Sequence, residues 1–116
     1  MIRRGEIREV DLEPVRGSEA SKRRPAIIVS NDAANATASR LGRGVVTVVP
    51  ITSNVDRVYP FQALLPATAT GLPGDSKAQA EQVRSVSVER IGECMGVIPP
   101  SLMEQIEEAL RLHLSL

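Results

Sequence analysis

The stretch Arg23-Arg24-Pro25-Ala26-Ile27-Ile28-Val29-Ser30-Asn31-Asp32 places a short apolar strand between a basic cluster and a group of polar side chains. A second stretch, Val48-Val49-Pro50-Ile51-Thr52-Ser53-Asn54, also changes abruptly from an apolar strand to hydroxyl and amide groups. Continuous runs of Ile and Val are typical of strands that are buried on both faces. The two stretches therefore predict a small β scaffold that carries a fixed cation, hydroxyls and amides at its strand ends.

Weaker patterns on either side of these stretches predict further strands. Residues 6–12 alternate, with Arg8, Val10 and Leu12 on one face, which is typical of a half-buried strand. The other expected strands cover residues 25–30, 45–51, 58–65, 78–88 and 92–98. Because the strands are short and evenly spaced, we expect a small, strongly curved sheet or barrel.

Two positions carry helix-start signals. Asn31 or Asp32 can cap a short helical turn after the first buried strand. Near the C-terminus, Ser101 and Glu104 form a capping-box pattern after two prolines, and apolar residues then recur at helical spacing. His113 is in phase with this apolar stripe, so we expect it to pack against the sheet. The chain is therefore predicted to be mainly β (α+β), with an amphipathic C-terminal helix.

Length and composition indicate one small cytoplasmic domain. The 116 residues predict a single domain over 1–116 with an aliphatic core, since Tyr59 and Phe61 are the only aromatic residues. A lone cysteine, Cys94, cannot form an internal disulfide, and we expect it in the core as a small hydrophobe. Neither a signal-peptide pattern nor an apolar run of about 18 residues is present, so no membrane association is expected.

Charge limits the possible functions further. The net charge is zero, but residues 1–60 carry ten Lys and Arg against seven Asp and Glu, and residues 61–116 carry four against seven. The two halves are therefore +3 and −3. The zero net charge argues against a general nucleic-acid coat but allows a local basic patch for a few phosphates. With one His, one Cys and no acidic pair at metal-ligand spacing, the sequence predicts no metal and no cofactor.

Six motifs occur in an order that resembles a known family. They are Arg4-Gly5-Glu6-Ile7, Val10-Asp11-Leu12-Glu13-Pro14, Gly17-Ser18-Glu19, the stretch 24–32, Pro50-Ile51-Thr52-Ser53-Asn54 and Glu81-Gln82-Val83-Arg84-Ser85. In these motifs the chain resembles the MazF/PemK toxins of bacterial type II toxin–antitoxin systems. The resemblance implies an SH3-like small β barrel with a C-terminal helix, working as a homodimer. The family commonly has Trp where this chain has Arg8, and we expect Arg8 to extend its charged end to water.

The resemblance also implies an activity. Family members are sequence-specific, metal-independent endoribonucleases that cut single-stranded RNA, whether mRNA, rRNA or tRNA, and a cognate antitoxin holds them inactive. The 2′-hydroxyl of the RNA attacks, which leaves 2′,3′-cyclic phosphate and 5′-hydroxyl ends. The family's catalytic pair corresponds to Arg24 and Thr52. A guanidinium matches two phosphate oxygens, and a threonine hydroxyl can donate to a third, so these residue types suit the reaction.

A wider set of polar residues is predicted to contact RNA: Ser18, Glu19, Lys22, Arg23, Ser53, Asn54 and Gln82. Lys22 and Arg23 either grip flanking phosphates or are ordinary loop charges. Glu19 accepts a proton, anchors a guanidinium or is a solvated loop charge, so the general base is left unassigned. Gln82 is expected on a strand face, where it either touches RNA or forms hydrogen bonds within the barrel.

Two alternative functions fit parts of the sequence. CcdB toxins share the expected fold and poison DNA gyrase, but they depend on a terminal aromatic residue, and this chain ends Leu114-Ser115-Leu116. A catalytically inactive RNA-binding relative is suggested only by Arg8. The presence of both Arg24 and Thr52 favours the nuclease over either alternative.

Overall fold

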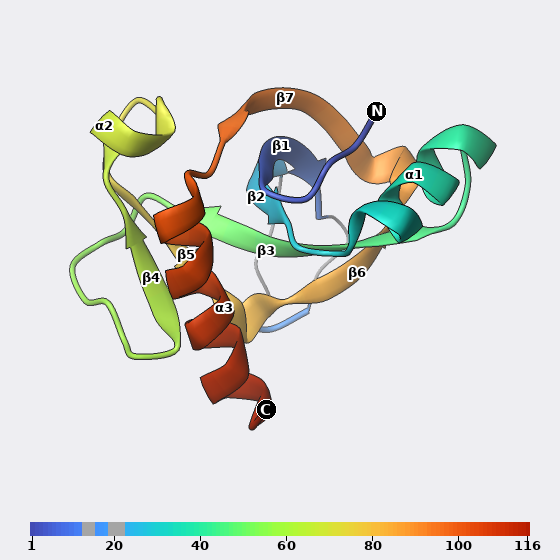
Figure 1. Ribbon diagram of the computed structural model, residues 1–116. Coiled ribbons are helices and arrows are strands. Elements are labelled where there is room, and N and C mark those ends of the chain that lie inside the picture. Colours follow the sequence, from blue (N-terminus) through green and yellow to red (C-terminus); the bar gives the residue numbers. More distant parts are fainter. Residues whose placement is uncertain (13–15, 19–22) are drawn as a thin grey trace.

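The computed structural model describes residues 1–12, 16–18 and 23–116, and in them a curved antiparallel sheet carries three helices (Figure 1). The strands are β1 (Glu6–Asp11), β2 (Arg23–Ile28), β3 (Val45–Thr52), β4 (Gln62–Leu65), β5 (Ser76–Gln79), β6 (Arg84–Ser87) and β7 (Ile91–Val97). The helices are α1 (Asp32–Leu41), α2 (Ala67–Thr70) and α3 (Pro100–Leu114), with 3₁₀ turns η1 (Ala80–Gln82) and η2 (Val88–Arg90).

Strand β3 joins the pair β4 and β5 to the strands β2, β1 and β7. The strand order is β4-β5-β3-β2-β1-β7, and β6 pairs with β3 outside this path. The first half of β3 pairs with β6 and its middle with β2, whereas its last two residues, Ile51 and Thr52, pair with β5. This change of neighbours along one strand accompanies the strong curvature seen in Figure 1, and α3 packs against β4 and η1. The predicted mainly β fold with a C-terminal helix is confirmed.

Both faces of the central strands are buried, as the continuous apolar runs predict. Ile27 of β2 is fully buried in a cluster that includes Ile106 of α3. Its neighbour Ile28 is fully buried in a second cluster, which includes Ala38 of α1. Because successive side chains of a strand point to opposite faces, β2 and β3 fill one cluster on each side of the sheet.

Strand β1 also contributes to both clusters, so the half-buried strand predicted for residues 6–12 is wrong, although Val10 and Leu12 share one face as the alternation predicts. Ile7 lies in the cluster under α3, whereas Val10 and Leu12 lie in the other. The pairing of β1 with β7 shifts register on each side of Arg8. The extra residues of both irregularities lie in β7, so β1 keeps its alternation and buries apolar residues on both faces.

Arg8 does not extend to water. Its side chain is 15% exposed and donates to Glu6 Oε1 from Nη2 at 3.0 Å, to the Gly92 carbonyl at 3.0 Å and to the Met1 carbonyl at 3.0 Å. Burial raises the pKa of the Glu6 carboxyl, but hydrogen bonds from the Arg3 N–H and the Arg8 guanidinium outweigh it and hold that pKa below its usual value. The guanidinium turns inward because these acceptors surround it, so the sequence-based expectation is wrong.

The start of α1 agrees with the prediction. The Asn31 side chain accepts a hydrogen bond from the Ala34 N–H at 2.8 Å and caps the helix. The helix then continues for ten residues, longer than the predicted turn, and ends at Gly42, whose φ of 65° is left-handed. Glycine adopts this conformation without steric cost, which explains why the helix stops there.

The capping box predicted for α3 is wrong. The helix begins at Pro100, before Ser101, and its N-cap Pro99 makes no side-chain hydrogen bond. A proline at the first helical position has no N–H to satisfy, so it starts a helix readily. His113 is exposed in the last turn, and its predicted packing role is also wrong. None of the helices in the described residues is long and apolar enough to span a membrane.

The weaker strand patterns correspond to shorter elements. Only β4 forms within 58–65, because the Gln62 N–H closes a turn on the Tyr59 carbonyl at 2.9 Å. Residues 78–88 are divided by η1, so Gln82 lies in a 3₁₀ turn and not on a strand face. Cys94 is exposed rather than in the core, since it lies on β7, at the end of the strand order.

Candidate functional site

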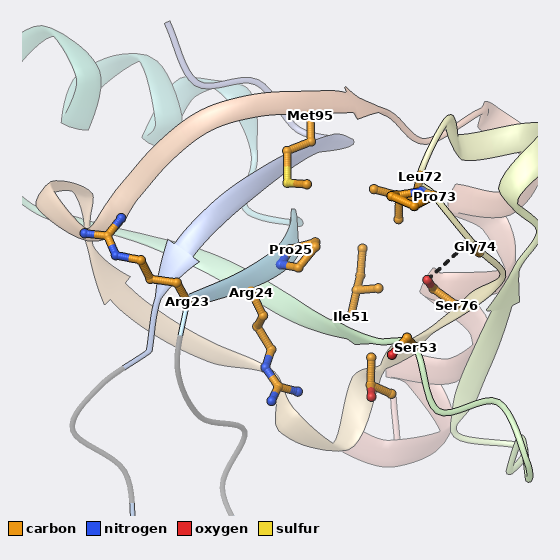
Figure 2. Close-up of a pocket in the computed structure, with 11 residues that line it drawn as sticks. Arg23, Arg24, Pro25, Ile51, Ser53, Leu72, Pro73, Gly74, Ser76 and Met95 are labelled. Atoms are coloured by element: carbon orange, nitrogen blue, oxygen red, sulfur yellow. Dashed lines mark hydrogen bonds between the residues drawn. The ribbon is translucent and has the colours of Figure 1, made fainter.

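A pocket of about 410 Å³ lies where β2 begins and β3 ends (Figure 2). The lining residues are Arg23, Arg24, Pro25, Ile51, Thr52, Ser53, Leu72, Pro73, Gly74, Ser76 and Met95. They come from β2, β3 and the residue that follows it, the 71–75 loop, the first residue of β5 and the middle of β7. The pocket therefore joins the two stretches that the sequence singles out.

Strand pairing brings the two predicted catalytic residues together. Ala26 of β2 pairs with Pro50 of β3 in an antiparallel register. Arg24 lies two residues before Ala26 and Thr52 lies two residues after Pro50, at adjacent ends of the two strands, and both line the pocket. The rigid sheet thus holds a cation and a hydroxyl at one wall of the pocket.

Arg23 and Arg24 extend in different directions, as Figure 2 shows. The side chain of Arg24 extends toward the part of the pocket where Ser53 lies, and that of Arg23 extends away from the pocket centre. Arg23 is exposed and forms an ion pair with Glu9 at 3.7 Å. It also lines a second, polar pocket, to which Arg90 contributes. Arg24 therefore lines the first pocket alone, whereas Arg23 lines both the first pocket and the polar pocket beside it.

Local hydrogen bonds orient the hydroxyl of Thr52. Its Oγ1 accepts from the Asn54 N–H at 3.3 Å, and Asn54 Oδ1 accepts in turn from the Asp56 N–H at 3.2 Å. A threonine hydroxyl also has one hydrogen to donate, and accepting a bond from Asn54 does not use it. Thr52 can therefore donate to an oxygen of a bound group, whereas the Asn54 side chain takes part in a turn.

The opposite wall of the pocket is apolar. It consists of Pro25, Ile51, Leu72, Pro73 and Met95, of which Met95 is 42% exposed. Figure 2 shows Pro25 and Ile51 between the arginines on one side and Leu72 and Pro73 on the other. Donors on one side and apolar surface on the other suit a nucleotide, which has an anionic phosphate beside a flat, less polar base.

Comparison with known proteins agrees with this geometry. The family described as "PemK-like, MazF-like toxin of type II toxin-antitoxin system" matches residues 3–114. The chain belongs to this family. Endoribonuclease MazF9 of Mycobacterium tuberculosis (strain ATCC 25618 / H37Rv) is 62% identical over 116 residues, which cover 100% of this chain and 98% of that protein. The family predicted from the sequence motifs is therefore confirmed.

Solved structures of MazF proteins share the fold. MazF (Form-I) from Deinococcus radiodurans superposes with a TM-score of 0.83 at 27% identity, covering 99% of this chain and 97% of that one. The MazE–MazF structure (Form-III) from the same organism gives a TM-score of 0.75 at 25% identity, with the same coverage of 99% and 97%. The similarity extends over almost the full length of both chains.

Other residues predicted to contact RNA in this MazF-like chain lie outside the pocket. Gln82 Nε2 donates to the Ser18 carbonyl at 3.1 Å, so η1 is tied to residues 16–18. Neither of these two residues lines the pocket. Glu19 and Lys22 fall outside the residues that the structure describes. Of the predicted set, Arg23, Arg24, Thr52 and Ser53 are brought together at the pocket.

Sequence reasoning missed an aromatic cluster that follows the site. The rings of Tyr59 and Phe61 stack with centroids 5.2 Å apart and an angle of 4° between their planes. The Arg57 guanidinium lies 5.6 Å from the Tyr59 ring centre, and Tyr59 is 41% exposed. The sequence does contain a signal for this cluster. Tyr59 and Phe61, the only aromatic residues of the chain, are two positions apart and follow the second apolar stretch. This MazF-like chain therefore offers exposed ring surface on the β3–β4 connection.

No residue of the described site has an evident role as general base. His113 is exposed near the end of α3 and does not line the pocket. Within residues 1–12, 16–18 and 23–116, no group of three or more His, Cys, Asp and Glu is arranged to hold a metal ion. The chemistry that this part of the chain provides is that of a guanidinium and hydroxyl donors.

Proposed function

We propose that this chain is the endoribonuclease toxin of a type II toxin–antitoxin system, which cuts single-stranded RNA at a short sequence without a metal ion. The observation that carries the proposal is the pocket in which the strand pairing of β2 and β3 brings together Arg24 and Thr52. The full-length similarity to a protein named endoribonuclease MazF9 supports it. Residues 1–116 act as one domain, as a cytoplasmic homodimer that a cognate antitoxin inhibits.

The chemistry follows from the residues at the pocket. The 2′-hydroxyl of the RNA attacks the adjacent phosphorus, a bond to the 2′-oxygen forms and the bond to the 5′-oxygen breaks. The products are a 2′,3′-cyclic phosphate and a 5′-hydroxyl, after the 2′-hydroxyl loses a proton and the 5′-oxygen gains one. Negative charge grows on the phosphate oxygens during attack, and the Arg24 guanidinium and Thr52 hydroxyl stabilise it. Donors fixed by a sheet need little reorganisation as the charge develops.

The RNA-binding surface extends from this pocket on two sides. Arg23 lines both the first pocket and the polar pocket beside it, so it can hold a phosphate next to the one that is cut. Ser53 and the apolar wall contact the base or sugar that enters the first pocket. The proposed RNA contacts are Ser18, Glu19, Lys22, Arg23, Ser53, Asn54 and Gln82. The substrate is mRNA, rRNA or tRNA, since single strands let bases turn outward.

Induced expression in a bacterial host tests this proposal. Growth should stop within minutes of induction, and sequencing of RNA ends should reveal new 5′-hydroxyl ends at one short motif. Arg24→Ala should abolish both effects, and Arg43→Ala is the matched control because Arg43 is exposed and does not line this pocket. Growth arrest with intact RNA and inhibited supercoiling would overturn the proposal in favour of a gyrase poison. Continued growth with soluble, folded wild-type protein would indicate an inactive relative.

A further inference from the structure

Lys77 occupies an unusual position beside the site. It lies in β5 directly opposite Thr52 of β3, and on its other side it pairs with Leu64 of β4. Its side chain is enclosed, with the residue only 8% exposed. A buried lysine thus shares a sheet ladder with the hydroxyl that we assign to the reaction.

The partner of this ammonium is a backbone carbonyl. Lys77 Nζ donates to the Arg57 carbonyl at 2.6 Å. In the described part of the chain, none of the ion pairs involves Lys77. An enclosed ammonium without a carboxylate partner is costly, and an apolar side chain of similar volume is often equally or more stable in such a place. The hydrogen bond from Lys77 to the Arg57 carbonyl therefore points to a role in holding the backbone at Arg57.

That role concerns the segment 53–61, which connects β3 to β4. Its first part contains Ser53 of the pocket, and its last part contains the Tyr59–Phe61 stack. The Arg57 guanidinium donates to Tyr59 Oη at 3.3 Å, so the side chains of this segment contact each other. Short-range turn bonds join residues 52 to 56 and 59 to 62. The bond from Lys77 holds the backbone between these two turns to the sheet.

We propose that Lys77 is a positioning residue that fastens the segment 53–61 to β5 and thereby presents Ser53 and the Arg57–Tyr59 pair to bound RNA. This inference rests on the proposed function, because it assigns the segment a role in holding the substrate. Thr52 itself belongs to β3 and keeps its place through strand pairing. Loss of the Lys77 bond should consequently weaken RNA binding far more than it slows the chemical step.

The test compares Lys77→Met with Lys77→Arg. Methionine keeps length and volume but removes the donor, whereas arginine keeps a cationic donor. In Lys77→Met the KM for RNA should rise about tenfold, since a hydrogen bond to a charged group is lost, while kcat changes about twofold or less. The melting temperature should stay equal or rise, and amide hydrogen exchange in 53–61 should accelerate about tenfold or more. Lys77→Arg should restore KM and exchange protection, and Arg111→Met, on the exposed face of α3, is the matched control.

Each outcome either supports or overturns the proposal. A raised KM with faster exchange confined to 53–61, in a protein as stable as the wild type, supports the proposal. An unchanged KM, an unchanged exchange pattern, or a parallel loss of stability, kcat and KM would overturn it. If Lys77→Met does not fold, Lys77→Gln, which is too short to reach the carbonyl, gives the same readouts. The exchange measurement needs no RNA, so it decides the fastening role even if wild-type protein fails to cleave and the proposed function falls.

Discussion

Replacing Thr52 by valine tests the assignment of its hydroxyl to the reaction. Valine keeps the branched shape and the preference for a strand, so the pairing of β3 with β5 should persist. The substitution removes the hydroxyl that the last residue of β3 brings to the pocket that Arg24 lines. It also removes the oxygen that accepts from the Asn54 N–H at 3.3 Å.

The size of each effect follows from these contacts. One donor aimed at transition-state charge contributes about 2.7–4 kcal/mol, so kcat should fall about 10²- to 10³-fold. The hydrogen bond from Asn54 is long and exposed, and water can replace it, so the free energy of unfolding should fall by less than about 1 kcal/mol. For a domain of this size, that loss lowers the melting temperature by no more than about 5 °C. Thr52→Ser keeps the hydroxyl and should lose about tenfold in kcat or less.

The assay is single-turnover cleavage of a short single-stranded RNA that contains the preferred motif, with thermal unfolding measured in parallel. Single-turnover rates at saturating protein report the chemical step, and the protein-concentration dependence reports RNA binding. The reasoning is refuted if Thr52→Val cleaves within about threefold of the wild-type rate, because that ratio is worth less than about 1 kcal/mol. A large fall in melting temperature would also contradict it, since the rate loss would then reflect misfolding.

Three further substitutions test other parts of the account. Arg23→Ala should make RNA binding less dependent on salt, lowering the slope of log K against log[salt] by about 0.7, with the largest loss of affinity at low salt; an unchanged slope would mean that Arg23 touches no phosphate. Hydrogen bonds hold the pKa values of Glu6 and Asp32 below their usual values, so their stabilisation is complete above the unfolded pKa values of about 4 and is lost as pH falls through the folded ones. Glu6→Gln should therefore flatten the acid limb of a plot of stability against pH, and an equally steep limb would show that this carboxyl is not responsible. His113→Gln should leave the cleavage rate and its pH profile unchanged, because His113 is exposed on α3 away from the pocket; a lost acid or alkaline limb would assign it a proton transfer.

The sequence predicted the central strands and the main site residues because local patterns determine them. The runs around Ile27 and Val49 are apolar at every position and rich in β-branched residues, which is typical of strands buried on both faces. Arg24 and Thr52 each lie where such a run meets polar residues, so their presence at strand ends could be read directly. Their meeting at one pocket then follows from the antiparallel pairing of β2 with β3, in which Ala26 lies opposite Pro50.

The features that the sequence did not predict depend on contacts between distant residues. Arg8 turns inward because Gly92, 84 residues away, supplies a carbonyl, and no local pattern contains that partner. From the sequence alone, Lys77 is expected to be a surface charge. In the structure β5 pairs with β3, and Lys77 is buried there. The Ser101–Glu104 pattern satisfied a local rule, but the helix starts at Pro100, which needs no cap for its own nitrogen.

The central claim is that Arg24 and Thr52 form the active site of a metal-independent ribonuclease. The most direct test is cleavage of a defined pool of single-stranded RNA by purified, antitoxin-free protein in EDTA, beside Arg24→Ala, with all new ends sequenced and their phosphates identified. We predict cuts at one short motif, with 2′,3′-cyclic phosphate and 5′-hydroxyl ends, and no cuts by the variant. Cleavage that requires an added metal ion, or that persists in folded Arg24→Ala, would contradict the account.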